Sequence, residues 1–166
     1  MSHTLAILLG FVLLAPPDLL PGQPSPVRAD SQFAVIVHPS TPIDDLTLAQ
    51  LRRVFFGRQQ FWQGGQRVVL FVYPSSTSEG EFVLRHLYQM SENEFKRYWI
   101  AKTFRDDVTT GPKIVSSTAM ALRLTASVPG AVAVIPASAV DETVKVLSID
   151  RKLPGVDNYP LTARPR

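Results

Sequence analysis

The stretch VVLFVYPSSTSEG, residues 68–80, predicts how one strand and one helix of this chain meet. Its apolar residues 68–72 are typical of a buried strand, which Pro74 ends. Four hydroxyl residues follow in a row: Ser75, Ser76, Thr77 and Ser78. Serine and threonine favour helix N-termini, because their oxygens accept hydrogen bonds from the first free N–H groups. The stretch therefore predicts a strand, a turn and a helix that begins within the hydroxyl run.

Apolar periodicity predicts the remaining elements on both sides of this stretch. Uninterrupted apolar runs predict three further strands, at Phe33–Val37, 131–135 and 144–149. Apolar residues at helical spacing predict four helices, within 46–57, 82–88, 94–104 and 118–127. Buried strands that are separated by helices are typical of α/β layer folds. The sequence therefore predicts an α/β fold in which helices flank a mixed, partly parallel sheet.

Two of these helices have clear starting signals. Thr47 with Gln50, and Ser91 with Glu94, have the spacing of capping boxes, in which each side chain bonds the other residue's backbone N–H. Gly57 follows the first helix, at a position where a glycine often ends a helix. These signals are local, so they predict both helix starts and one helix end without knowledge of the tertiary fold.

Residues 1–29 have the layout of a secretory signal peptide. The apolar run LAILLGFVLLA, residues 5–15, is shorter than the roughly 20 residues that span a bilayer. Val27 and Ala29 are placed as the small residues before a cleavage site. No Lys or Arg precedes the run, so an uncleaved anchor is the alternative. We expect a periplasmic protein with one domain over residues 30–166 and an irregular tail from about Lys152.

The composition narrows the class of protein further. The chain of 166 residues contains no cysteine, which fits a bacterial periplasm better than a disulfide-stapled secreted domain and excludes thiol chemistry. The net charge is only +3, and the basic residues form no tract with interleaved aromatics, so we expect no nucleic-acid partner. No motif for a metal is present, and no cofactor is expected.

The hydroxyl run is a poor setting for a nucleophile. It matches neither the G-x-S-x-G nor the S-x-x-K pattern. Only His38 and His86 follow the leader, and a packed or surface role is the simpler interpretation of each. We therefore expect that the protein is not an enzyme.

Two interpretations of the hydroxyl run remain open on residue types alone. A helix N-terminus offers free N–H groups and a partial positive charge, and hydroxyls add donors for an oxyanion. The alternative is simple capping, because Ser78 with Glu81, or Ser76 with Glu79, has capping-box spacing.

The order of four motifs resembles a known family. These motifs are LTLAQLRRVFFGRQQFW, then VVLFVYPSSTSEGEFVL, then RYW, and later PGAVAVIPAS. Together they resemble the phosphate-type substrate-binding proteins of ABC transporters, and more closely their short single-domain relatives in the type 2 periplasmic-binding-protein-like superfamily. The resemblance implies one lobe of that fold. It also implies that Ser75, Ser76 and Thr77 contact an oxyanion, with Ser78 as a cap or a further contact.

The chain departs from the family pattern just before the hydroxyl run. The family carries an Arg and an Asp there, whereas this chain has Phe71, Val72, Tyr73 and Pro74. Arg58 or Arg67, from the preceding loop, could supply the missing cation. The chain is also long enough for only about one lobe, so a homodimer that provides the second lobe is an alternative.

Two functions are therefore expected from the sequence. The first is an exported solute-binding module for phosphate or a similar oxyanion, working with a membrane transporter. The second is a ligand-free, one-lobed scaffold that binds a membrane protein or sensor. Phe61 and Trp62 would favour the second if they are exposed, because aromatic anchors are common at interfaces; otherwise they pack over the core.

Overall fold

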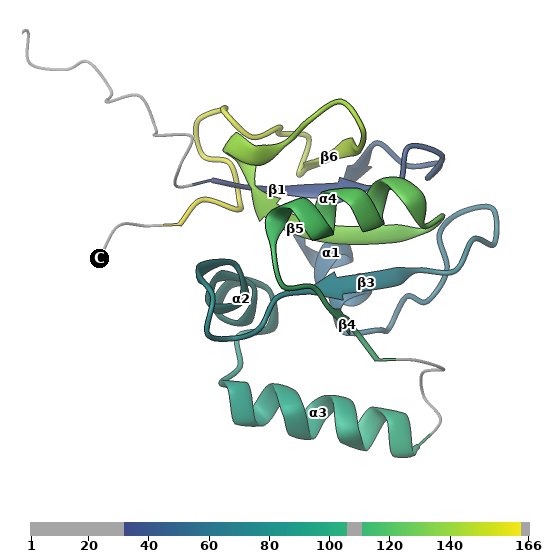
Figure 1. Ribbon diagram of the computed structural model, residues 1–166, viewed down its shortest axis with the longest axis vertical. Helices are drawn as coiled ribbons and strands as arrows, with labels where there is room; N and C mark the ends of the chain where they lie inside the picture. The colour runs from purple at the N-terminus through teal and green to yellow at the C-terminus, as the bar shows by residue number, and fades with distance from the viewer. Residues whose placement is uncertain (1–31, 106–110, 164–166) are drawn as a thin grey trace, which may run out of the picture.

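The computed structural model describes residues 32–105 and 111–163, which form one six-stranded sheet covered by helices on both faces (Figure 1). Its strands are β1 (Phe33–Val37), β2 (Asp45–Leu46), β3 (Val69–Val72), β4 (Lys113–Ile114), β5 (Ala131–Pro136) and β6 (Lys145–Ile149). They lie in the order β2-β6-β1-β5-β3-β4. β1 runs antiparallel to both of its neighbours, and the other pairs are parallel. The predicted α/β fold with a mixed sheet is confirmed.

The helices are α1 (Leu48–Phe55), α2 (Ser78–Val83), the π-helical η2 (Leu84–Tyr88), α3 (Glu92–Phe104), α4 (Thr118–Ser127) and the short 3₁₀ turn η3 (Ala137–Ala139). Helices α1 and α3 begin where the capping signals predict. Both expected capping boxes form, Thr47 with Gln50 and Ser91 with Glu94. Gly57 follows α1 with a φ of 60°, which only glycine adopts readily.

The central strands are buried on both faces, which explains their uninterrupted apolar sequences. Along β1, Val35 and Val37 face a core that is shared with α1, α2 and the C-terminal segment. Ala34 and Ile36 face a second core that is shared with α4. Figure 1 shows α4 in front of the sheet and α1 behind it.

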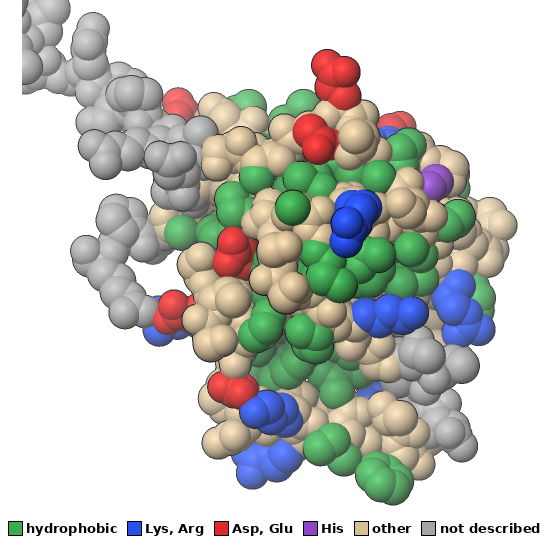
Figure 2. Space-filling model, viewed as in Figure 1, with side chains coloured by type: hydrophobic (Ala, Val, Ile, Leu, Met, Phe, Trp, Pro, Cys, Tyr) green, Lys and Arg blue, Asp and Glu red, His purple; other side chains and the backbone are tan. Residues whose placement is uncertain are grey.

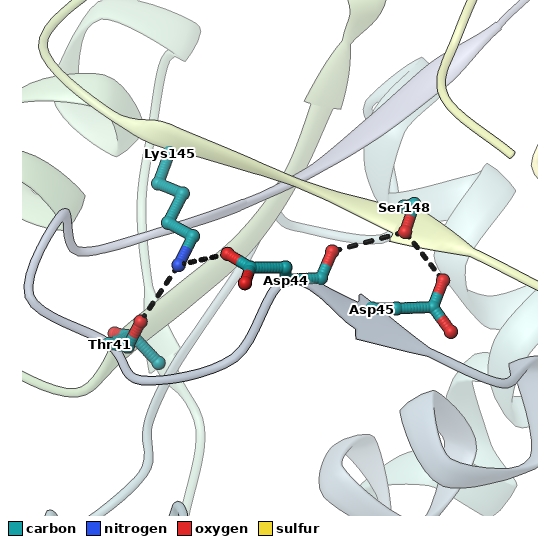
Figure 3. A network of polar contacts seen from close by, with 5 residues as sticks. All are labelled: Thr41, Asp44, Asp45, Lys145 and Ser148. Carbon is teal, nitrogen blue, oxygen red and sulfur yellow. Dashed lines mark hydrogen bonds and ion pairs between the residues drawn. The ribbon is translucent and has the colours of Figure 1, made fainter. Parts of the chain in front are cut away.

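Two short strands were not expected, and polar contacts hold one of them (Figure 3). The Lys145 ammonium bonds the Asp44 carboxylate at 2.6 Å and the Thr41 carbonyl at 3.1 Å. The Ser148 hydroxyl donates to the Asp44 carbonyl and the Asp45 carboxylate. Asp44 and Asp45 are both exposed, Asp45 lies in β2, and the two residues join β2 to β6.

The loop aromatics Phe61 and Trp62 have different environments. Trp62 is buried, and its indole Nε1–H donates to the Gly130 carbonyl at 2.9 Å. Phe61 is half exposed and lies under the Arg67 guanidinium, 5.1 Å from the ring centre. Only Phe61 of this pair therefore reaches the surface as a partner anchor would.

The second predicted helix consists of α2 and η2. Its backbone hydrogen bonds are α-helical in α2 and π-helical in η2. Gln89 ends it in the left-handed conformation, with a φ of 54°. The Tyr88 hydroxyl donates to the Phe55 carbonyl at 2.7 Å, and Arg52 donates to the His86 carbonyl at 2.9 Å. These bonds tie η2 to α1 and fix the direction in which α2 leaves the sheet.

After β6 the chain is irregular but packed. Tyr159 and Leu161 are buried, and the Leu161 carbonyl accepts from the Phe33 N–H at 2.9 Å. Within residues 32–105 and 111–163, no helix is long and apolar enough to cross a membrane. The expected signal peptide, residues 1–29, lies outside the described residues.

Candidate functional site

The hydroxyl run forms a tight turn between β3 and α2, and Thr77 holds it closed. The Thr77 N–H donates to the Pro74 carbonyl at 3.0 Å, and its hydroxyl donates to the same carbonyl at 2.9 Å. The Thr77 hydroxyl also accepts from the Gly80 N–H at 3.1 Å, so Thr77 is the N-cap of α2. The third helical residue after this cap is a glycine without a side chain.

Neither of the capping boxes expected for this helix exists, because Thr77 is the cap. Ser76 lies before it, exposed, and Ser78 is already the first helical residue. The Ser78 hydroxyl donates instead to the Glu79 carboxylate at 3.0 Å. The Thr77 hydroxyl is therefore already used in hydrogen bonds within the turn, whereas Ser76 is exposed to solvent.

The turn leaves several backbone donors unused. Among the described residues, the N–H groups of Ser76, Ser78 and Glu79 donate to no acceptor. They lie together at the start of a helix that runs on through η2 to Tyr88. Free N–H groups at a helix N-terminus, together with the helix dipole, favour an anion. This arrangement is the main chemical feature of the site.

Gly80 lets this turn lie against α2. A Cβ at Gly80 would sit 2.0 Å from the Pro74 carbonyl oxygen and 3.1 Å from the Ser75 nitrogen. Both contacts are with backbone atoms, which cannot rotate away. A side chain at position 80 would therefore displace the turn that carries the free N–H groups.

We expect Gly80→Ala to lower the free energy of unfolding by about 1–3 kcal/mol, the usual cost of overpacking. Urea denaturation of the two proteins checks this. Ser78→Ala is the control, because it changes an exposed residue of the same turn and should shift stability by about 0.5 kcal/mol or less. An unchanged Gly80→Ala protein would mean that the turn moves freely away from the helix.

A cavity of about 410 Å³ opens beside the turn. Ser75 and Ser76 lie on its border, and its walls are mostly apolar side chains: Val72, Val83, Leu84, Phe95 and Ile114. α3 and the edge strand β4 therefore contribute to a site that the sequence placed on one loop. The charged residues of the cavity wall are Glu92 and Lys96, one turn apart on α3.

Glu92 and Lys96 neutralise each other. The Lys96 ammonium lies 2.5 Å from the Glu92 carboxylate. This contact and then a hydrogen bond from the Ser75 hydroxyl lower the pKa of Glu92. Burial raises the pKa of Tyr73, so its hydroxyl stays neutral at the cavity wall. The cavity therefore has little net charge, and its capacity for an anion rests on the backbone donors.

The arginines expected as substitutes lie elsewhere. Arg58 stacks over Phe56, 5.3 Å from the ring centre, and Arg67 stacks over Phe61. Arg67 precedes β3, at the end of the strand opposite to the hydroxyl turn. Neither guanidinium borders the cavity beside the turn. The suggestion that one of them replaces the family arginine is wrong.

The histidines have structural surroundings. His86 stacks on Phe82 with ring centres 4.1 Å apart, and its Nδ1 lies 3.2 Å from the Phe82 carbonyl. His38 bonds Ser40 at 2.8 Å. Among the described residues, no group of three His, Cys, Asp or Glu side chains could hold a metal ion.

Sequence reasoning found the turn but missed the residues opposite to it. Glu92, Lys96 and Ile114 had no signal of their own, because the sequence marked the start of α3 only by the pair Ser91 and Glu94. They approach the turn because α3 folds back beneath β3 and because β4 extends the sheet (Figure 1). The sequence-based expectation that the turn contacts an oxyanion could not reveal that α3 and β4 form the opposite wall of the cavity.

The mixed sheet with helices on both faces, and the hydroxyl turn between a strand and a helix N-terminus, can be compared with solved structures. An ABC-type phosphate transport receptor from Vibrio cholerae matches with a TM-score of 0.64 and 21% identity over 78% of this chain and 52% of that chain. The resemblance inferred from the motifs is thus confirmed at the level of the fold.

Two further solved structures agree. A putative phosphate ABC transporter substrate-binding protein from Clostridium perfringens, solved with bound phosphate, has a TM-score of 0.60 and 18% identity over 74% of this chain and 46% of that one. PstS from Borrelia burgdorferi has a TM-score of 0.61 and 15% identity over 80% of this chain and 55% of that chain. The chain thus spans about half the length of each. No protein-family model matches it, and no curated protein does.

Proposed function

We propose that this chain is an exported solute-binding module that takes phosphate or a similar oxyanion at the turn Ser75–Ser78. The observation that carries the proposal is the group of unused N–H donors at Ser76, Ser78 and Glu79, at the start of a helix and beside a cavity. The fold shared with phosphate-binding proteins supports the same site. The signal-like residues 1–29 support export.

The four hydroxyl residues have different roles in this proposal. The Ser76 hydroxyl and the N–H groups of Ser76 and Ser78 donate to the oxyanion. Thr77 shapes the turn, since its own N–H and hydroxyl are bonded to Pro74. Ser75 reaches the ligand from the cavity border. Because no arginine pairs with the anion, we expect weaker binding than a site with a bidentate cation would give.

The test removes one N–H donor without changing the helix. Ser78→Pro deletes the N–H at the first helical position, where proline is well tolerated, and Thr77 before it has the extended conformation that proline requires. Calorimetry with phosphate, using residues 30–166, should show binding that Ser78→Pro weakens. Ser78→Ala is the matched control, because it keeps the N–H and removes only the hydroxyl.

The outcomes separate the donors from the hydroxyl. Loss of binding in Ser78→Pro with retention in Ser78→Ala supports the backbone site, and sulfate tests selectivity. If the unchanged protein shows no binding heat and no thermal shift at millimolar phosphate, the proposal is overturned.

A scaffold that binds a protein partner is the second candidate function. The observation that favours it is an exposed apolar surface on α3 and β4, where Ile100 and Phe104 reach solvent. If the protein does not bind phosphate, this exposed apolar surface makes the scaffold the better account of its function.

A further inference from the structure

A second apolar cavity, of about 480 Å³, lies between α3 and the segment that leads into β4. Phe95, Trp99 and Thr103 border it from α3, and Pro112 and Ile114 border it from the other side. It shares Phe95, Lys96 and Ile114 with the cavity beside the hydroxyl turn. The two hollows therefore form one groove, which we call the α3–β4 groove, running from the turn toward the end of α3.

Large apolar side chains project from the rim of this groove. Phe104 is 85% exposed, Ile114 58% and Ile100 57%. Figure 2 shows hydrophobic side chains on α3 at the bottom of the molecule, next to basic ones. Single exposed apolar residues are ordinary, but several gathered around an apolar groove are typical of an interaction surface. β4 is also a terminal strand of the sheet, so its outer edge belongs to the same face.

This face carries both a hollow and projecting side chains. It carries both a groove and the projecting Phe104, and a two-fold interface requires each copy to present both halves of the contact. A projecting side chain of one copy can fill the groove of the other, and the reverse contact then forms by symmetry.

The charges on α3 fit an antiparallel second copy. Its first turn carries the acid Glu94, whereas Glu92 is already paired with Lys96, and its end is basic, with Lys102 and then Arg105. Antiparallel packing of two α3 helices places the acidic turn of each against the basic end of the other. The two helix dipoles oppose each other in the same arrangement, which is favourable.

The length of α3 sets where the projecting side chains would fall. Tyr98 is midway along the helix Glu92–Phe104. A two-fold axis near Tyr98 places position 104 of one copy opposite position 92 of the other. Glu92 borders the cavity beside the hydroxyl turn, so Phe104 of the partner copy arrives at that cavity.

We propose that a second copy of this chain docks on the α3–β4 groove, with the two α3 helices antiparallel, and that Phe104 of each copy closes the cavity beside the other copy's hydroxyl turn. The dimer would add a second wall to the cavity beside the turn. Closure excludes water from the N–H donors and so strengthens their attraction for an anion. This last step rests on the proposed function, whereas the dimer itself does not.

Sedimentation of residues 30–166 over a range of protein concentrations tests the dimer directly. We expect a dimer that Phe104→Glu dissociates, raising the dimer dissociation constant by about tenfold or more. Leu153→Glu is the matched control, because Leu153 is a half-exposed apolar residue outside the groove. A monomer at every concentration, or a dimer that survives Phe104→Glu, would overturn the proposal.

A disulfide test fixes the orientation of the helices. Because the chain has no cysteine, Arg97→Cys introduces a single thiol next to the midpoint of α3, on its exposed side. Antiparallel helices bring the two copies of position 97 close enough for mild oxidation to link them, whereas Glu142→Cys, exposed far along the chain, should stay unlinked. Equal linking of both variants would contradict the orientation.

Phosphate titration of the Phe104→Glu monomer separates the two proposals. Weaker but measurable binding supports a site that the partner completes. A dimer without any phosphate binding would refute the proposed function and leave the docking surface intact. Phosphate binding of equal strength in monomer and dimer would refute closure by Phe104.

Discussion

Gly130→Ala should lower the free energy of unfolding by about 2–5 kcal/mol, from two additive effects. Gly130 has a φ of 81°, in the left-handed region that other residues adopt only at a penalty of roughly 1–2 kcal/mol. A Cβ at this position would also lie 2.0 Å from the Arg67 carbonyl oxygen, and overpacking adds about 1–3 kcal/mol. Urea denaturation followed by circular dichroism measures the change.

Gly65→Ala separates the two effects. Gly65 has nearly the same conformation, with a φ of 84°, but a Cβ there meets no atom within 4 Å. We expect this control to show the backbone penalty alone and to lose less stability than Gly130→Ala. Equal losses in the two variants would show that the Arg67 backbone moves aside and that crowding at Gly130 is unimportant.

The position of Gly130 explains why the motif PGAVAV needs a glycine. Its carbonyl accepts hydrogen bonds from the Trp62 indole and from the Val69 N–H, at 2.9 and 3.0 Å. One peptide unit thus joins the loop before β3 to the start of β5. The absence of a side chain at Gly130 allows the approach, and Arg67 occupies the space that a side chain would need.

Local signals predicted the long elements, and the short ones needed the tertiary fold. The capping pairs Thr47–Gln50 and Ser91–Glu94 lie three residues apart, so each is visible in the sequence. β2 and β4 have two residues each, too few for any periodicity. β2 exists because Ser148 and Lys145, about a hundred residues away, bond its loop.

The candidate site also has one part that local sequence signals predicted and another part that depends on the tertiary fold. The hydroxyl turn was predictable because it lies within one segment, although the choice of Thr77 as the cap was not. That choice depends on the close approach of Pro74 to Gly80, which is a property of the backbone path. The opposite wall was hidden, because Lys96 and Ile114 belong to elements whose packing gave no sequence signal.

Trp62→Ala should lower the free energy of unfolding by about 3–5 kcal/mol, the usual loss for truncation of a buried tryptophan. Trp62 is 3% exposed and packs in the core that the sheet shares with α1 and α2. Its removal leaves a cavity and also takes a hydrogen bond from the Gly130 carbonyl. Denaturant unfolding measures the loss, and Trp62→Phe, which keeps an aromatic ring without the N–H donor, should fall between the two proteins.

Phe61→Ala is the matched comparison, because it truncates the neighbouring aromatic residue at the surface. Phe61 is 50% exposed, so we expect a loss of about 1 kcal/mol or less, from its contact with Arg67. The pair tests the two interpretations of the loop aromatics. If Trp62→Ala leaves stability unchanged, the side chain is not a core residue, and the sequence-based alternative of a partner anchor returns. If it unfolds the protein while Phe61→Ala does not, Trp62 stabilises the fold that presents the hydroxyl turn.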